Sequence, residues 1–171
     1  MPVRYYLSIL LILPLILCFN SLEDIPPERQ WSQYRGYYSN GTLDVANLPE
    51  KWGVPRNENI RWKKEIPGLG LSSPVVWGNK LFITTAISEQ DSDGLKTGIY
   101  GDIGSVNDDS EHEWKVICIN KQDGQTIWER TSCTGIPEQK RHPKSSHANS
   151  SVATDGKHVI AFFGSEGIYC Y

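Results

Sequence analysis

The sequence has little of what marks a highly charged protein or a helical one. Acidic and basic side chains nearly balance over its 171 residues, which leaves a formal net charge of −3. Such a chain has no long-range field that would collect nucleic acid or anionic lipid. From Trp31 onward, no stretch carries a helical period of apolar residues over three turns, which argues against an α-helical domain. A nucleic-acid-binding role is therefore not expected.

Cysteine is scarce and forms no paired motif. The chain has Cys18, Cys118, Cys133 and Cys170, with no Cys-x-x-Cys spacing and no adjacent pair. A disulfide framework is therefore not indicated. One bridge remains open in an oxidising compartment, but Cys118 and Cys170 lie in apolar runs, where a buried free thiol is the simpler interpretation.

Long hydrophobic runs are missing except at the start of the chain. Arg4 precedes the apolar residues 5–17, a run shorter than the roughly 20 residues of a membrane-spanning helix. Residues 1–21 are therefore predicted to be a cleaved signal peptide. An uncleaved anchor and a lipid attached to Cys18 remain alternatives. All three make the protein exported, periplasmic or extracellular, with membrane contact only through an uncleaved signal or a lipid anchor.

What the sequence does have, from Trp31 onward, is the pattern of an all-β protein. Short apolar runs are separated by Gly, Pro, Asn and Asp, and Asp123-Gly124 and Asp155-Gly156 are typical of tight hairpin turns. This pattern predicts strands at residues 60–66, 73–77, 80–85, 114–120, 126–130, 150–154, 158–163 and 168–171.

The chain also repeats itself. Residues 73–83 align with residues 150–161 as two copies of one hairpin, and Trp62 corresponds to Trp128. The first copy carries about 25 extra residues; without them the two tryptophans lie about 41 residues apart, within the range of about 40 to 50 of one four-stranded propeller blade. The sequence therefore predicts a β-propeller of which about one and a half blades are present.

Residues 118–128 carry a more specific signal. Their spacing resembles the tryptophan docking motif of propeller blades of the pyrroloquinoline-quinone (PQQ) type, Ala-x-Asp-x-x-x-Gly-x-x-x-Trp, with Asn120 in place of the Asp and with Gly124 and Trp128 intact. The resemblance implies structural roles. Asn120 would accept a backbone hydrogen bond, Gly124 would take a positive φ, and Trp128 would lie between blades.

A broader resemblance covers residue 31 to the end. The Trp-x-Gln-Tyr-Arg-Gly element at 31–36 is followed by further spaced segments at 48–52, 60–63, 72–76 and 163–171. Together they resemble exported PQQ-binding-like repeat proteins of the quinoprotein alcohol dehydrogenase-like superfamily. The resemblance implies an N-terminal extension at 22–59 and a partial PQQ-like propeller domain at 60–171, so that the chain is interpreted as an N-terminal fragment.

Two segments were candidates for chemistry. The acidic insertion at 86–113 could offer Ca²⁺ ligands, but it lacks the full ligand pattern of a calcium loop, so a solvated surface loop is expected and no metal site is predicted. The segment 141–149 gathers Arg141, His142 and His147, which could form a ligand-facing loop at the propeller mouth. The spacing of the two histidines fits no standard metal pair.

Three functions remain open. The first is a non-catalytic binding or scaffold module that presents a face to a protein partner or a cell-surface ligand. The second is the N-terminal part of a PQQ-dependent dehydrogenase, for which PQQ and Ca²⁺ would be the cofactors; the chain shows no catalytic or cofactor-binding residue for it, and it lacks the adjacent Cys-Cys pair of those enzymes. The third is a partial product without a function of its own.

Overall fold

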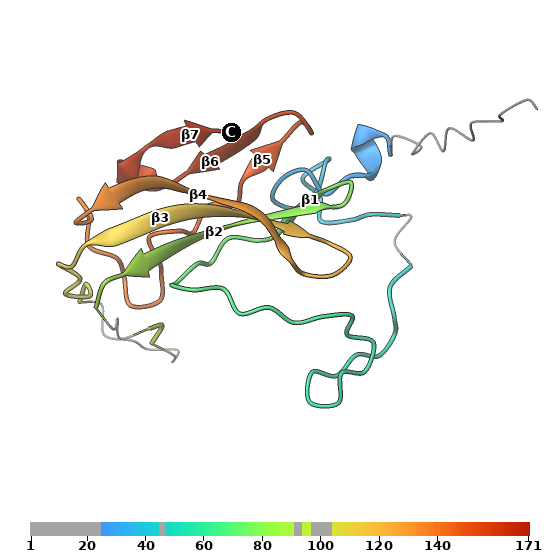
Figure 1. The fold of residues 1–171 in the computed structure, drawn as a ribbon, viewed down its shortest axis with the longest axis horizontal. Helices are drawn as coiled ribbons and strands as arrows, with labels where there is room; N and C mark the ends of the chain where they lie inside the picture. The colour runs from blue at the N-terminus through green and yellow to red at the C-terminus, as the bar shows by residue number, and fades with distance from the viewer. Residues whose placement is uncertain (1–24, 45–46, 91–93, 97–103) are drawn as a thin grey trace, which may run out of the picture.

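Residues 25–44, 47–90, 94–96 and 104–171 are described by a computed structural model of the chain. They form two antiparallel sheets and two short 3-10 turns, η1 (Pro27–Arg29) and η2 (Gly164–Glu166), which confirms the all-β prediction (Figure 1). Among these residues, no helix has the length and apolarity needed to cross a membrane. The predicted signal peptide, residues 1–21, lies outside the described residues.

The first sheet is an up-and-down meander. Its strands β1 (Val75–Trp77), β2 (Lys80–Ser88), β3 (His112–Asn120) and β4 (Thr126–Gly135) neighbour one another in sequence order. Tight turns join β1 to β2 and β3 to β4, and Gly78 and Gly124 supply positive φ angles of 57° and 74° there.

The second sheet repeats the same order with shorter strands. It consists of β5 (Ala153–Thr154), β6 (Val159–Phe162) and β7 (Ile168–Cys170) in the order β5-β6-β7, and Figure 1 shows it alongside the first sheet. One apolar core joins the two sheets, with these buried members: Val75, Phe82, Ala86, Trp114, Val116, Cys118, Ala148, Val152, Val159, Ala161 and Phe163.

Strand alternation decides which side chains enter that core. On β6, Val159 and Ala161 are buried, whereas Ile160 and Phe162 point the other way and are exposed. Ile168 pairs with Phe162 across the sheet and is exposed as well. The second sheet therefore carries apolar side chains on both faces.

The N-terminal segment at residues 31 and 32 forms backbone hydrogen bonds with the first strand of each sheet, β1 and β5. The amide of Trp31 donates to the Val76 carbonyl, and the Trp31 carbonyl accepts from the Val76 amide, at 3.1 and 2.8 Å. One residue later, the Ser32 carbonyl accepts from the Thr154 amide on β5 at 2.9 Å. The segment that carries the predicted Trp-x-Gln-Tyr-Arg-Gly element thus bridges both meanders.

The prediction of a strand at 60–66 was wrong. The structure assigns no strand there. Trp62 holds the segment through its side chain, because its indole Nε1 donates to the Lys121 carbonyl at 2.9 Å and its ring lies against Gly124. The apolar side chains of this segment anchor it to the protein, and its backbone does not pair with a neighbouring strand.

The prediction for the acidic insertion was also wrong in part. The paired strands extend into it, as far as Ser88 on β2 and back to His112 on β3. Of the described residues between these strands, Val106 and Asp108 are buried, and the Val106 amide donates to the Arg141 carbonyl at 3.0 Å. An apolar side chain and a neutralised carboxylate hold this end of the insertion against the protein.

Candidate functional site: a groove between the sheets and a buried polar cluster

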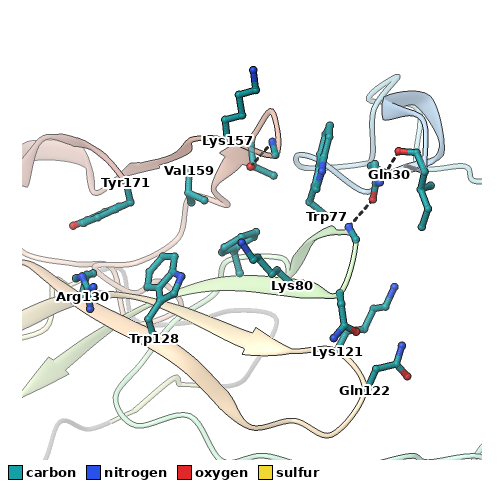
Figure 2. Close-up of a pocket in the computed structure, with 16 residues that line it drawn as sticks. Gln30, Trp77, Lys80, Lys121, Gln122, Trp128, Arg130, Lys157, Val159 and Tyr171 are labelled. Atoms are coloured by element: carbon teal, nitrogen blue, oxygen red, sulfur yellow. Dashed lines mark hydrogen bonds between the residues drawn. The ribbon is translucent and has the colours of Figure 1, made fainter. Parts of the chain in front are cut away.

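A groove of about 1150 Å³ lies between the two sheets. Figure 2 shows Trp77, Trp128 and Tyr171 along it, with the cationic side chains of Lys80, Arg130, Lys121 and Lys157 at its rim. None of the described residues that line it is a carboxylate, a histidine or a cysteine. The groove can pack aromatic and anionic groups.

The three residues of the proposed docking motif lie at this groove and at the turn beside it. The Asn120 side-chain oxygen accepts the Gln122 amide at 2.9 Å, and the Gly124 amide donates to the Asn120 carbonyl at 2.8 Å. The Trp128 ring lies between Phe82 of the first sheet, at 5.9 Å, and Tyr171, which follows β7, at 6.1 Å between ring centroids. Trp128 thus fills the space where the two sheets meet.

A cluster of four titratable side chains lies at the other end of β3. It gathers Asp108 from the insertion, His112 from the first position of β3, and Arg141 and His147 from the connection between the sheets. Together they line one side of a pocket of about 320 Å³, whose remaining wall is mostly formed by residues 86–90 and the Gly68-Leu69 pair.

Asp108 is the centre of the cluster. Its Oδ1 lies 3.4 Å from His112 Nε2, and its Oδ2 lies 3.4 Å from His147 Nε2. Oδ2 also accepts a hydrogen bond from Arg141 Nε at 3.2 Å. The Asp108 side chain is 6% exposed, so its charge is buried and compensated by the guanidinium.

The backbone just before β3 holds the His112 ring in one orientation. Its Nδ1 lies 2.9 Å from the Ser110 carbonyl oxygen. A carbonyl oxygen can only accept, so Nδ1 carries the proton and donates it. In the neutral ring this leaves the Nε2 lone pair directed at Asp108.

His147 is fixed from its backbone and from its ring. The Trp114 indole donates to the His147 carbonyl at 3.1 Å, and the His112 ring meets the His147 ring edge-on, 5.1 Å away and at 76°. Burial and the neighbouring His112 lower the pKa of His147, which favours the neutral imidazole. Its Nε2 is buried and makes no hydrogen bond with any described residue.

Arg141 is as deeply buried as Asp108, with 2% of its side chain exposed. Besides the Asp108 contact, its Nη1 donates to the Gly94 and Ser145 carbonyls at 3.3 and 3.2 Å. Its Nη2 has no hydrogen-bond partner among the described residues. The cluster therefore contains two buried polar nitrogens that no described residue binds by a hydrogen bond, His147 Nε2 and Arg141 Nη2.

Only part of the sequence-derived site comes together. Arg141 and His147 meet in the cluster, whereas His142 is exposed and its Nδ1 accepts from the Lys144 amide at 3.1 Å. Sequence reasoning missed Asp108 and His112. Their spacing of four positions was a weak signal, hidden because Asp108 belongs to a run of acids that resembled a solvated loop.

Comparison of the chain with family models, curated proteins and solved structures finds no match. What the protein can do is therefore argued from its geometry. The groove offers aromatic surface and cations. The buried cluster offers two imidazole nitrogens, a carboxylate and a guanidinium beside a small pocket.

Proposed function

We propose that the protein is an exported binding or scaffold module, built as a β-propeller of PQQ-like repeats. The observation that carries this proposal is the second sheet, which is apolar on both faces. One face forms the core with the first sheet, while the other exposes Ile160, Phe162 and Ile168 by 40, 47 and 68%.

An apolar face of this kind needs a cover. A sheet that carries apolar side chains on both sides is stable when another layer packs on each side. The first two meanders already stack in this way, with Trp128 at their junction. A further meander of the same kind on the exposed face would continue the radial stacking of a propeller.

Binding fits the geometry better than catalysis does. The described lining of the large groove holds aromatic and cationic side chains and no carboxylate or imidazole. Arg141 and His147 of the polar cluster and the exposed His142 lie on the connection between the sheets, at the end of the meanders where a propeller presents its loops. We place the binding face at this end, with a protein partner or a cell-surface ligand as its occupant.

Photo-crosslinking tests where the binding face is. A photoreactive residue replaces His142 in one variant and, in a control variant, the exposed Lys157 at the opposite end of the sheets. Both variants are expressed in the producing cells and irradiated. We expect a discrete adduct from position 142 alone. Equal, diffuse adducts from both positions would contradict a binding face at the His142 end.

A titration separates the scaffold from a quinoprotein dehydrogenase. PQQ with Ca²⁺ is added to the purified protein while quinone absorbance and dye-linked alcohol oxidation are followed. At PQQ concentrations well above micromolar, we expect neither a change in quinone absorbance nor turnover. Stoichiometric binding with turnover would make the protein a dehydrogenase and overturn the scaffold proposal.

Export has its own test. The mass and N-terminal residue of the protein recovered from the cell exterior and from the membrane fraction distinguish the three predicted fates of residues 1–21. A soluble product that results from cleavage near Asn20 or Ser21 is expected. A product that keeps Met1 in the membrane, or one that begins with a lipid-modified Cys18, would support an anchored form.

A further inference from the structure

We propose that Asp108, His112 and His147 form a binding site for a divalent transition-metal ion of the zinc class, with one coordination position open to the adjoining pocket. The site goes beyond the proposed scaffold function, and its test does not depend on that function. Each of the three residues offers one ligand atom, and the three atoms lie within 4.8 Å of one another.

The distances between the ligand atoms suit such an ion. At bond lengths of about 2.0 to 2.1 Å, two ligands of a tetrahedral zinc ion lie about 3.3 Å apart. Asp108 Oδ1 lies 3.4 Å from His112 Nε2, and Asp108 Oδ2 lies 3.4 Å from His147 Nε2. Each imidazole nitrogen thus lies at tetrahedral separation from one carboxylate oxygen, and the three ligand atoms, which lie within 4.8 Å of one another, would close by small side-chain movements onto one ion.

The tautomer of His112 points to a cation. Because the Nδ1 proton of His112 is donated to the Ser110 carbonyl, the ring presents Nε2 to the Asp108 carboxylate. An ion between Nε2 and the carboxylate would be bound by both. The hydrogen bond from a ligating histidine to a backbone carbonyl is also the usual outer support of a metal-bound imidazole.

His147 supplies the independent observation. Its side chain is 9% exposed, and its Nε2 makes no hydrogen bond with any described residue. Asp108 Oδ2 lies 3.4 Å away without forming a hydrogen bond, and a buried nitrogen that makes no hydrogen bond is destabilising unless something binds it. The Trp114 indole holds the backbone carbonyl of His147 and the His112 ring contacts its ring, and neither contact uses Nε2.

Charge and ligand type define what the site accepts. Arg141 neutralises Asp108, so a divalent ion would add two uncompensated charges to a buried place. The open position therefore favours hydroxide or another small anion, for which Arg141 Nη2 is an unused donor. Two imidazoles and one carboxylate suit zinc-class ions, whereas Ca²⁺ requires about six to eight oxygen ligands.

The test uses the four histidines of the chain as two matched pairs. His112 and His147 belong to the cluster, while His142 and His158 are exposed and lie outside it. The purified protein, stripped with a chelator, is titrated with Zn²⁺ by calorimetry and with Co²⁺ by visible absorption. The variants are H112Q/H147Q and H142Q/H158Q.

We expect one ion per chain in the unaltered protein and in H142Q/H158Q. The Co²⁺ spectrum should be that of a low-coordinate site without a thiolate charge-transfer band, because no cysteine belongs to the cluster. In H112Q/H147Q, affinity should fall by at least about 100-fold, since even the loss of an outer partner costs about 10- to 100-fold. Equal affinity in both variants, or binding that disappears in H142Q/H158Q, would overturn the proposal.

A second measurement keeps the proposal testable if H112Q/H147Q fails to fold. An ion that binds only the native state raises the midpoint of thermal unfolding. Zn²⁺ should therefore raise the midpoint of H142Q/H158Q as much as that of the unaltered protein, whereas Ca²⁺ and Mg²⁺ should leave both unchanged. No shift with Zn²⁺ in H142Q/H158Q would refute the site.

Discussion

At the scale of single residues, substitutions at two glycines would distinguish the cost of backbone strain from the cost of side-chain crowding. Gly78 and Gly124 both have positive φ, at 57° and 74°. A Cβ added at Gly78 would meet nothing within 4 Å, whereas one at Gly124 would lie 2.8 Å from the Trp62 ring. The two turns therefore differ in what a side chain would cost.

We predict that Gly124→Ala lowers the free energy of unfolding more than Gly78→Ala does. The second change should cost about 1 kcal/mol for the positive φ alone. The first adds displacement of Trp62 and should cost about 2 to 4 kcal/mol. Urea unfolding of both variants checks this, and equal losses would show that Trp62 does not press on the turn.

The cysteines should differ in reactivity. Burial raises the pKa of Cys118 to about 11, so at pH 8 only about one thiol in a thousand is the reactive thiolate. Cys170 is exposed. In a chain of residues 1–171 alone, iodoacetamide at pH 8 should alkylate Cys170 within minutes and Cys118 only after urea is added, as peptide mass spectrometry can measure. Rapid labelling of Cys118 in native buffer would mean that β3 opens.

At the scale of elements, β2 is linked to the start of the second sheet by a buried hydroxyl. Thr84 is 2% exposed and donates from Oγ1 to the Ser150 carbonyl at 3.1 Å. We predict that Thr84→Val, which preserves shape, lowers the free energy of unfolding by about 1 to 2 kcal/mol.

The matched control for Thr84→Val is Thr131→Val on β4. Thr131 is exposed, so its replacement should stay within about 0.5 kcal/mol. Thermal and urea unfolding of both variants give the comparison. If the two substitutions lower the free energy of unfolding equally, the Thr84 hydroxyl does not stabilise the contact between β2 and the segment that leads into the second sheet.

The sequence predicted the hairpins well because their signals are local. Apolar alternation and Asn or Asp beside Gly lie within a few residues of each other, and residues 73–85 and 158–171 contain the strands that they predicted, with small shifts at the ends. Residues 60–66 carried the same local signal. No neighbouring strand pairs with them, and sequence spacing holds no information on that.

The polar cluster was only half predictable for the same reason. Arg141 and His147 lie within one polar loop, so their shared location was readable from the chain. Asp108 meets Arg141 across 33 positions, and its carboxylate is indistinguishable in sequence from its solvated neighbours. Burial and pairing, which set Asp108 apart, arise only when the insertion folds back over the end of β3.

At the scale of the whole molecule, the two-faced second sheet leads to the last prediction. Phe162 and Ile127 are each exposed by 47%, yet only Phe162 lies on the face that we propose a further meander covers. In a chain that carries this proposed meander, Phe162→Ala should lower the free energy of unfolding by about 3 kcal/mol. Ile127→Ala should cost less than about 1 kcal/mol.

Denaturant unfolding of the two alanine variants decides between a covered and an uncovered face. A small and equal loss in both would leave the outer face of β6 in water and remove the main support for the propeller. A large loss in Phe162→Ala alone would support a third layer. Far-UV circular dichroism of both variants before unfolding checks that each one has folded.

The connection between the two meanders is bonded to the first of them. The Leu71 amide donates to the Ala148 carbonyl, and side chains of β2 and β3 donate to the carbonyls of Ser150 and His147. The spatial unit thus extends past Gly135, where the first sheet ends. A gene duplication or deletion that began at residue 136 would leave three donors facing a foreign loop. A breakpoint after Ser150 would keep all three of these bonds, so the unit that is bonded together is offset from the unit that the eye finds in the sheet.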